Sequence, residues 1–143
     1  MTAKILVVDD DSCMRELLQL HLRSAGYHVR VAEDAVVAGR MLLQSVPDLL
    51  IVEVDLRYMS GREFVATLVA DQSIPFIPVI FITANENFEP HAELLGADCI
   101  IKPCRVDEVL KLVARRLNGV VHTKGDTAAR AGSGAAALRV IRQ

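Results

Sequence analysis

The feature that most constrains the fold is the segment Leu49–Asp55, a short apolar run with two acidic residues near its carboxyl end. Pro47 and Asp48 precede it, and Ser60 and Gly61 follow it. Consecutive apolar residues between turn-forming residues are typical of a strand that is buried on both faces of a sheet. In open parallel sheets, ligands bind just outside the carboxyl ends of the strands. The acids at the end of this strand are therefore candidate site residues.

The rest of the first 118 residues repeats this alternation of apolar and amphipathic segments. It predicts strands at 4–8, 28–32, 49–55, 78–82 and 99–101, and helices at 12–24, 35–44, 62–71, 91–95 and 107–117. From the second helix we expect Val36, Val37, Met41 and Leu42 to face the core. Strands that alternate with helices form a parallel sheet covered on both faces. We therefore expect an α/β fold, as one doubly wound domain over residues 1–118.

From residue 119 the composition changes. Residues 119–143 are rich in glycine and alanine and end in a short basic and apolar stretch. This composition predicts a flexible tail or linker.

Composition and charge exclude several classes of function. The chain has 143 residues, of which 52% are hydrophobic and 24% charged, so we expect a globular protein. A formal net charge of -2 gives no basic field for nucleic acid, and no apolar run reaches the roughly 18–20 residues that span a bilayer. Cys13, Cys99 and Cys104 are scattered, and the first strand begins too early to leave room for a signal peptide. We expect reduced thiols in a cytoplasmic protein without a zinc site.

Polar residues follow four of the expected strands and should meet at one edge of the sheet: Asp9, Asp10, Asp11, Glu53, Asp55, Thr83 and Lys102. Converging carboxylates repel one another unless a cation neutralises them, and oxygen ligands select a hard metal such as Mg²⁺. A hydroxyl and an ammonium on the opposite rim suit a phosphoryl group, which needs a hydrogen bond and an opposite charge. The alternative is a set of solvated helix caps and strand ends.

Over roughly residues 3–118 the sequence resembles the receiver domain of two-component response regulators, as in chemotaxis regulators. The matching motifs are Asp9-Asp10 after Ile5-Leu6-Val7-Val8, Arg15-Glu16-Leu17-Leu18, Gly26-Tyr27, Pro47-Asp48-Leu49, Gly61, Pro78-Val79-Ile80, Thr83-Ala84, Gly96-Ala97-Asp98 and Lys102-Pro103. The resemblance implies a flavodoxin-like sheet of strand order 2-1-3-4-5. It also implies an aspartate on the third strand that accepts a phosphoryl group from a histidine kinase with the help of Mg²⁺.

The position of that aspartate is occupied here by Glu53, whether one counts forward from Pro47 or back from Gly61. The resemblance implies that Asp10 binds Mg²⁺ directly, that Asp9 acts through water, and that the backbone carbonyl of Asp55 is a third contact. We therefore expect the metal site at Asp9, Asp10, Glu53 and Asp55. Thr83 and Lys102 fall at the hydroxyl and the ammonium that sense the phosphoryl group.

Glu53 changes the expected mechanism, because its carboxylate reaches roughly 1–1.5 Å farther than that of aspartate. A nucleophile misplaced by about that distance can lose on the order of 10²-fold in rate. The same reach places a permanent negative charge near Lys102 and Thr83, with about one charge against nearly two for a phosphate. Asp55 is expected to overshoot the pocket and not to replace Glu53 as acceptor.

We therefore expect an atypical receiver in phosphorelay signalling that works through protein–protein contacts, independently of ordinary phosphorylation. Its expected partners are a histidine kinase or another signalling protein, and an output domain could lie beyond Gln143. We expect a monomer or weak homodimer that binds neither nucleic acid nor membrane and has no enzymatic turnover.

Departures from the family pattern also indicate an atypical receiver. The stretch from Thr83 to Gly96 is about two residues shorter than is usual, which predicts a truncated fourth helix. Cys99 and Cys104 stand where aromatic residues are usual, so coupling of the site to the usual binding face is in question.

Three alternatives remain open from the sequence. The first is an interaction module with a vestigial, metal-free pocket. The second is a phosphohydrolase that forms an aspartyl-phosphate, for which Glu53 would have no role. The third, a nucleotide-binding flavodoxin-like domain, is weak because no glycine-rich phosphate loop is present.

Overall fold

The computed structural model describes residues 2–118 of the chain, in which five strands alternate with five helices. The predicted tail at 119–143 lies outside the described residues and stays a prediction. The elements in order are β1 (Lys4–Val8), α1 (Ser12–Ser24), β2 (His28–Ala32), α2 (Ala35–Gln44), β3 (Leu49–Glu53), α3 (Gly61–Ala70), β4 (Val79–Thr83), α4 (Glu89–Leu94), β5 (Asp98–Ile101) and α5 (Val106–Leu117).

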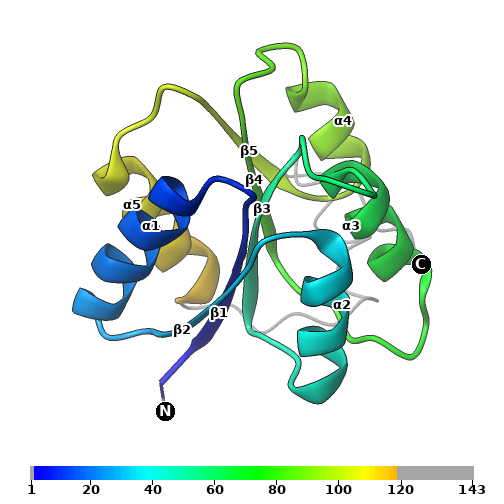
Figure 1. The fold of residues 1–143 in the computed structure, drawn as a ribbon, viewed down its shortest axis with the longest axis horizontal. Helices are drawn as coiled ribbons and strands as arrows, with labels where there is room; N and C mark the ends of the chain where they lie inside the picture. Colours follow the sequence, from blue (N-terminus) through cyan, green and yellow to red (C-terminus); the bar gives the residue numbers. More distant parts are fainter. Residues whose placement is uncertain (1, 119–143) are drawn as a thin grey trace.

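The strands form one parallel sheet of order β2-β1-β3-β4-β5, which confirms the expected topology. The sheet lies between two layers of helices, with α1 and α5 on one face and α2, α3 and α4 on the other (Figure 1). β3 is the central strand, and its last residue, Glu53, pairs with Ile82 of β4. Because all five strands run in the same direction, their carboxyl ends lie along one edge of the sheet.

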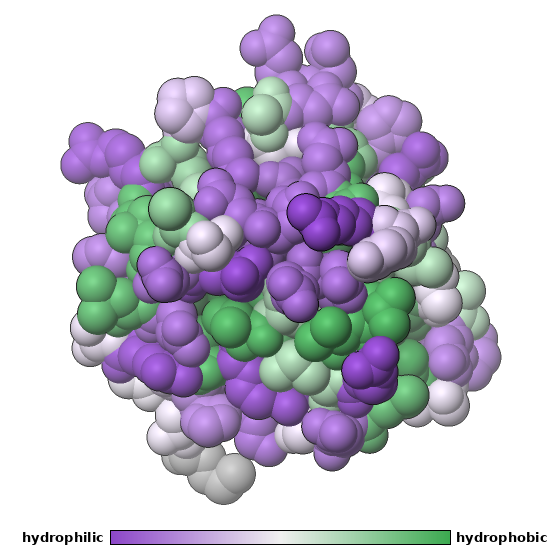
Figure 2. Space-filling model, viewed as in Figure 1, coloured by the Kyte–Doolittle hydropathy of each residue, from purple (hydrophilic) through white to green (hydrophobic). Residues whose placement is uncertain are grey.

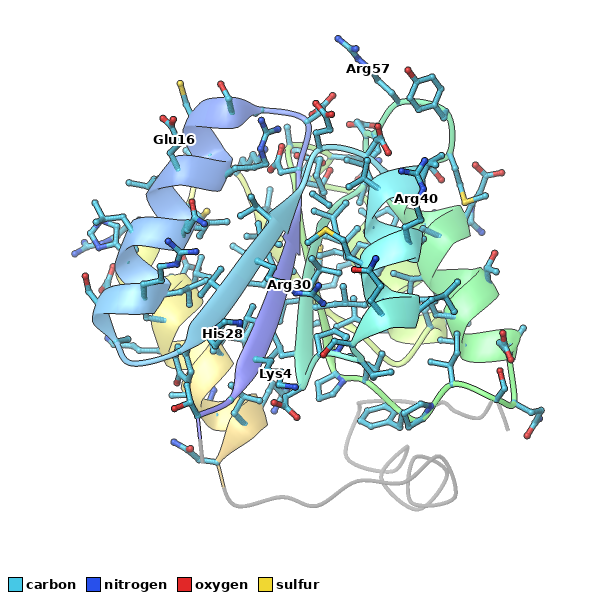
Figure 3. All side chains as sticks on the ribbon, turned by 60° about the horizontal axis from the view of Figure 1, so that its bottom comes forward. Lys4, Glu16, His28, Arg30, Arg40 and Arg57 are labelled. Atoms are coloured by element: carbon cyan, nitrogen blue, oxygen red, sulfur yellow. The ribbon has the colours of Figure 1, made fainter. Side chains whose placement is uncertain are left out.

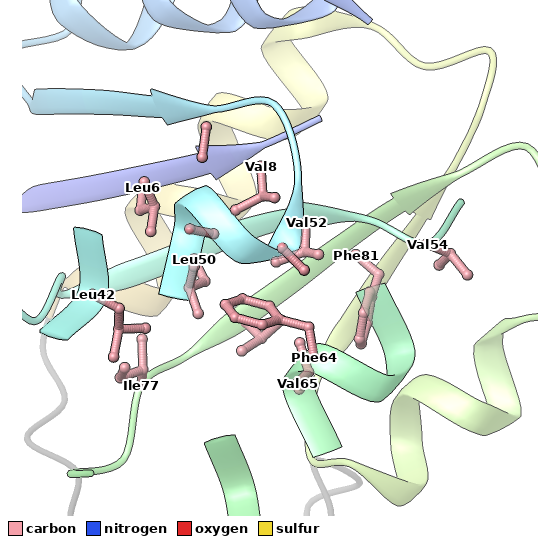
Figure 4. Close-up of a cluster of buried hydrophobic side chains, with 14 of the residues drawn as sticks. Leu6, Val8, Leu42, Leu50, Val52, Val54, Phe64, Val65, Ile77 and Phe81 are labelled. Carbon is pink, nitrogen blue, oxygen red and sulfur yellow. The ribbon is translucent and has the colours of Figure 1, made fainter. Parts of the chain in front are cut away.

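Alternation along the strands divides the core into two clusters. On β3, Leu50 and Val52 face the α2–α3–α4 layer, whereas Leu49 and Ile51 face α1 and α5. Figure 4 shows the first cluster, in which Phe64 of α3 packs among the strand residues. All five residues of β3 are buried, as expected for a central parallel strand.

Polar caps define where the helices begin. Asp11 accepts a hydrogen bond from the Cys13 amide at 2.9 Å, and Asp34 accepts one from the Val37 amide at 2.8 Å. Ser60 and Glu63 form a reciprocal capping box at the start of α3. These caps satisfy amide groups that have no partner within their helices.

The structure corrects two details of the sequence interpretation. Val36 does not face the core, since it is 50% exposed on the outer side of α2. The third strand ends at Glu53, and Asp55 lies exposed in the following loop. The strand ends there because the Val54 and Asp55 amides donate to the Glu53 carboxylate.

The predicted truncation of the fourth helix is confirmed, because α4 has only 6 residues. Cys13, Cys99 and Cys104 are free thiols, as expected. Among residues 2–118, no helix combines the length and the apolar character needed to cross a membrane.

Gly61 at the start of α3 allows a close approach between backbones. Its amide donates to the Val54 carbonyl oxygen at 2.8 Å. A Cβ atom at this position would collide with the Glu53 carbonyl oxygen and approach Val52 Cγ1 to 2.8 Å. The glycine therefore holds the β3–α3 loop against the end of β3.

Candidate functional site

The carboxyl edge of the sheet brings together residues that are far apart in the sequence. Asp9 follows β1, Glu53 ends β3, Thr83 ends β4 and Lys102 follows β5. Asp9, Glu53 and Thr83 are the buried polar residues among those that the structure describes. The Lys102 amide donates to the Thr83 carbonyl oxygen at 2.7 Å, which fixes the end of β5 beside β4. The edge predicted from the sequence is therefore a real cluster of buried polar groups.

The Glu53 carboxylate is held by three donors. Lys102 Nζ donates to Oε1 at 2.6 Å. The amides of Val54 and Asp55 donate to Oε2 at 2.8 and 3.2 Å. The longer side chain bends back toward its own backbone, and only 6% of Glu53 is exposed. Both carboxylate oxygens are therefore engaged within the protein.

Lys102 lies between two carboxylates. Its Nζ is 2.6 Å from Glu53 Oε1 and 3.8 Å from Asp9 Oδ2, and its side chain is 23% exposed. Burial by itself lowers the pKa of Lys102, but the hydrogen bond and charge of Glu53 outweigh it, with help from Asp9. The pKa therefore lies above the ordinary 10.5, and the ammonium is charged at neutral pH.

Asp9 is almost fully enclosed, with 3% of its surface exposed. Burial raises the pKa of its carboxyl above the ordinary 3.8, whereas the Asp11 amide and the Lys102 charge act in the opposite direction. The Asp11 amide donates to Asp9 Oδ1 at 2.9 Å, and Arg15 Nη1 donates to the Asp9 carbonyl oxygen at 2.7 Å. This carboxylate is held in place, but its charge is costly.

Thr83 is fully buried at the end of β4. Its Oγ1 accepts a hydrogen bond from the Asn85 amide at 3.1 Å. This bond aligns the start of the β4–α4 loop with the site. Within residues 2–118 the hydroxyl is bonded to Asn85 and not to Glu53, so the carboxylate reaches Lys102 but does not engage the second sensing residue.

The other two predicted metal ligands are Asp10 and Asp55, of which Asp55 was expected to act through its backbone carbonyl. Asp10 and Asp55 are both exposed, in contrast to Asp9 and Glu53. Among residues 2–118, no three acidic, histidine or cysteine side chains are arranged to hold a metal ion. The Lys102 ammonium lies between the two buried carboxylates, where it supplies the positive charge that a cation would supply. As arranged here, the donor groups do not fit Mg²⁺.

Several site groups have no signal in the sequence. Any residue type has a backbone amide, so the amides of Val54 and Asp55 could not be recognised as donors to Glu53. The same holds for the backbone amide of Asn85, which donates to Thr83. Arg15 is a polar residue on a helix surface, where such residues are common.

The two thiols near the end of β5, Cys99 and Cys104, have low reactivity. Burial, together with the charges of Glu89 and Asp98, raises the pKa of Cys99 to about 11. Burial also raises the pKa of Cys104. Both are protonated at neutral pH and therefore weak nucleophiles and weak metal ligands.

The arrangement favours a charge-stabilising role over nucleophilic chemistry. A nucleophilic carboxylate must present a free lone pair to the incoming atom. Here both Glu53 oxygens already accept hydrogen bonds, and the side chain is buried. The same bonds hold a negative charge permanently against Lys102.

The chain matches known proteins in sequence and in fold. Residues 5–114 match the model of the response regulator receiver domain. The chain is 29% identical over 123 residues to the transcriptional regulatory protein PhoP of Escherichia coli strain K12, with 82% of this chain and 54% of that protein covered. It thus spans about half the length of the curated relatives it matches.

Solved structures show the same fold. The chemotaxis response regulator CheY4 of Vibrio cholerae has a TM-score of 0.76 at 29% identity, covering 82% of this chain and all of that one (100%). A response regulator from Chloroflexus aurantiacus, described as putative, has a TM-score of 0.77 at 29% identity, with 83% and 100% covered.

Proposed function

The chain belongs to the family of response regulator receiver domains, which act in two-component signalling, and we propose that it is a receiver whose output is independent of ordinary phosphorylation. The observation that carries this proposal is the 2.6 Å bond between Glu53 Oε1 and Lys102 Nζ at the acceptor position. In this proposal Glu53 stands where a phosphoryl group would bind and keeps Lys102 engaged at all times.

The physical basis is the geometry of one carboxylate. Glu53 Oε2 is tied to two backbone amides and Oε1 to Lys102, so these bonds restrain the carboxylate and lower its nucleophilicity. The charge of Glu53 is about half that of a phosphoryl group at neutral pH. Glu53 also makes no bond to the Thr83 hydroxyl, which accepts a hydrogen bond from the Asn85 amide. We therefore propose a fixed state that resembles the phosphorylated one only at Lys102.

Signalling then depends on the surfaces of the domain. We propose that its partner is a histidine kinase or another signalling protein. The partner binds to the surface of the domain, and no phosphoryl group is transferred. The relative PhoP is a transcriptional regulatory protein of which only 54% is covered, and an output domain beyond Gln143 is part of this proposal. We further propose a cytoplasmic monomer or weak homodimer, without enzymatic turnover and without nucleic-acid contacts of its own.

A second candidate is a metal-free interaction module with a vestigial pocket. The observation in its favour is that Lys102 pairs with both buried carboxylates and offsets part of their charge without a metal. The two candidates differ in whether the pocket can still support phosphorylation when its acceptor is restored.

Intact-mass analysis after incubation with acetyl phosphate and Mg²⁺ separates these candidates, with the wild type run beside Glu53→Asp. We expect that only Glu53→Asp gains the mass of one phosphoryl group, because aspartate withdraws the carboxylate from Lys102 and frees it for attack. If neither protein is labelled, the pocket is vestigial and the second candidate holds.

Labelling of the wild type would contradict independence from phosphorylation. Hydrolysis of a generic phosphate ester, measured on the same samples, should be absent. Turnover that is lost in Asp9→Asn would instead favour a phosphohydrolase.

A further inference from the structure

A second feature of the molecule lies on the outer side of the α2–α3 layer. A groove of about 300 Å³ runs between α2 and α3. Its floor consists of core side chains, among them Phe64 and Leu68 of α3 and Ile74 of the following loop. The groove is lined almost entirely by apolar groups, and exposed apolar surface of this kind often marks an interaction site.

The walls of the groove are apolar side chains that the fold leaves in solvent. Val36 and Leu43 are 50% and 80% exposed, and Met59 of the β3–α3 loop is 39% exposed. Val36 and Leu43 are seven residues apart on α2, which is two turns or about 10.5 Å along the helix axis. Figure 2 shows apolar side chains at the surface over α2, between polar neighbours.

Gly39 forms the hollow between these two walls. It lies between Val36 and Leu43 on the same face of α2, and a Cβ atom there would meet only Phe64 Cε1, at 4.0 Å. A glycine inside a helix is unfavourable by about 1 kcal/mol relative to alanine. Nothing in the packing of the domain requires it, because space remains for a side chain. The glycine leaves a depression suited to an inserted side chain.

Two basic side chains lie beside the groove. Arg40 lines the groove and is the single charged residue of α2. Arg57 lies in the β3–α3 loop on the same side of the molecule (Figure 3). Within residues 2–118, the guanidinium groups of both arginines make no hydrogen bond and no ion pair. Two unpaired guanidinium groups beside an apolar groove complement an acidic partner.

We propose that this α2–α3 groove binds an amphipathic helix of a partner protein, with apolar residues at positions i, i+3 or i+4 and i+7 and acidic residues beside them. Anchors spaced in this way cover about 10.5 Å, which matches the distance from Val36 to Leu43. One anchor fills the hollow at Gly39, and the acidic residues pair with Arg40 and Arg57.

Charge argues against the two occupants that the chain itself could supply. A second copy bound face to face would bring together two patches that each carry Arg40 and Arg57. The apolar end of the tail, Leu138–Arg142, carries two arginines among three apolar residues. Repulsion between arginines disfavours both the second copy and the tail as occupants of the groove. The proposal goes beyond the function proposed above and holds whether or not the acceptor position is phosphorylated.

The test is a display library of helical peptides with leucine fixed at i, i+4 and i+7 and with randomised flanking positions, selected on the full-length protein. We expect selected peptides to be enriched in Asp and Glu. Their affinity should fall at least tenfold for Leu43→Ser, for Arg40→Glu and for Gly39→Gln, which fills the hollow. The matched control is Leu20→Ser on α1, which is 62% exposed on the opposite layer and should leave binding unchanged.

Four outcomes would overturn the proposal. The first is that no selected peptide loses affinity in Leu43→Ser, and the second is that basic peptides are selected equally well. The third is a wild-type dimer in sedimentation velocity that Leu43→Ser converts to a monomer, which would assign the groove to a second copy. The fourth is a perturbation of backbone amide NMR signals of α2 by Ile141→Ser in the full chain, which would assign it to the tail. Thermal unfolding of each variant shows whether it is folded.

Discussion

Glu53 differs from an aspartate by one methylene, and that methylene decides which groups its carboxylate can reach. It allows Oε1 to meet Lys102 and Oε2 to fold back onto two amides of the following loop. A buried carboxylate with three donors costs far less than an unpaired one. The side chain therefore acts as a structural part of the site and holds the end of β3, the β3–α3 loop and Lys102 together.

Asp9 is different, because its burial is only partly compensated. Its folded-state pKa lies above the ordinary 3.8, so between these values the folded protein binds more protons than the unfolded chain. The free energy of unfolding therefore falls as pH rises through that window, and at neutral pH the charge of Asp9 is destabilising.

Asp9→Asn should therefore stabilise the protein at pH 7, because the amide has no charge to desolvate, by on the order of 1 kcal/mol, the scale of a typical point mutation. The gain should shrink as pH is lowered through the window in which Asp9 becomes protonated. Urea unfolding at a series of pH values measures it. Asp10→Asn is the matched control, because Asp10 is exposed and its change should stay within about 0.5 kcal/mol. Equal gains from both variants, or a gain that grows toward acid, would contradict the assignment.

At the scale of secondary-structure elements, two glycines next to the site and the groove have opposite roles. Gly61 allows α3 to start directly against the end of β3, whereas Gly39 leaves an unfilled hollow on α2. Neither residue has a positive φ. At both positions, the room available for a Cβ atom determines the effect of a substitution.

Gly61→Ala should lower the free energy of unfolding by at least about 2 kcal/mol, since its Cβ would collide with the Glu53 backbone, which is less able to move than a side chain. Gly39→Ala should raise it by about 0.5–1 kcal/mol, through helix propensity and a less flexible unfolded chain. Parallel urea titrations of the two variants measure both effects. Destabilisation by Gly39→Ala would show that the helix needs this glycine, and tolerance of Gly61→Ala would show that the loop can retreat from β3.

The elements themselves could be predicted from the sequence because each strand is an apolar run between turn residues. The order of the strands came from the family resemblance. The sequence did not show which of the apolar residues are exposed. Val36 is apolar and lies beside other apolar residues, so periodicity alone placed it in the core. The groove could not be predicted, since it depends on a missing side chain at Gly39 and on the separation of two helices.

The sequence predicted which residues form the candidate site but not how they bond to one another. The strand ends brought Asp9, Glu53 and Lys102 together as expected. Asp55 was misplaced because the strand was assumed to continue past Glu53. The actual end of the strand depends on a side chain that bonds to its own following amides. Such a local competition between side chain and backbone leaves no periodic trace.

At the scale of the whole molecule, the two features occupy different surfaces. The site lies at the carboxyl edge of the sheet, and the groove lies on the outer side of the α2–α3 layer. The β3–α3 loop joins them, since it begins next to Glu53 and carries Met59 of the groove wall. The β3–α3 loop is therefore the segment that the two features share.

Magnesium provides a test of the charge balance on which the whole site depends. In the wild type, the Lys102 ammonium already lies between Asp9 and Glu53, where a cation would bind, so roughly 10 mM MgCl₂ should leave the thermal midpoint unchanged relative to NaCl of equal ionic strength. Glu53→Asp shortens the side chain and loosens its bond to Lys102, which leaves room for a cation beside Asp9. For a dissociation constant of about 1 mM, the variant should gain about 1.4 kcal/mol of stability at that concentration.

The gain should disappear with a chelator and should be reduced when Asp10→Asn is added to Glu53→Asp, because the resemblance implies Asp10 as a direct ligand. Differential scanning fluorimetry of the three proteins in both salts is sufficient. An equal gain in the wild type would mean that the Lys102 ammonium gives way to the metal and that Glu53 does not replace the switch. Without a gain in either protein, the acidic residues at this edge would serve only to position Lys102.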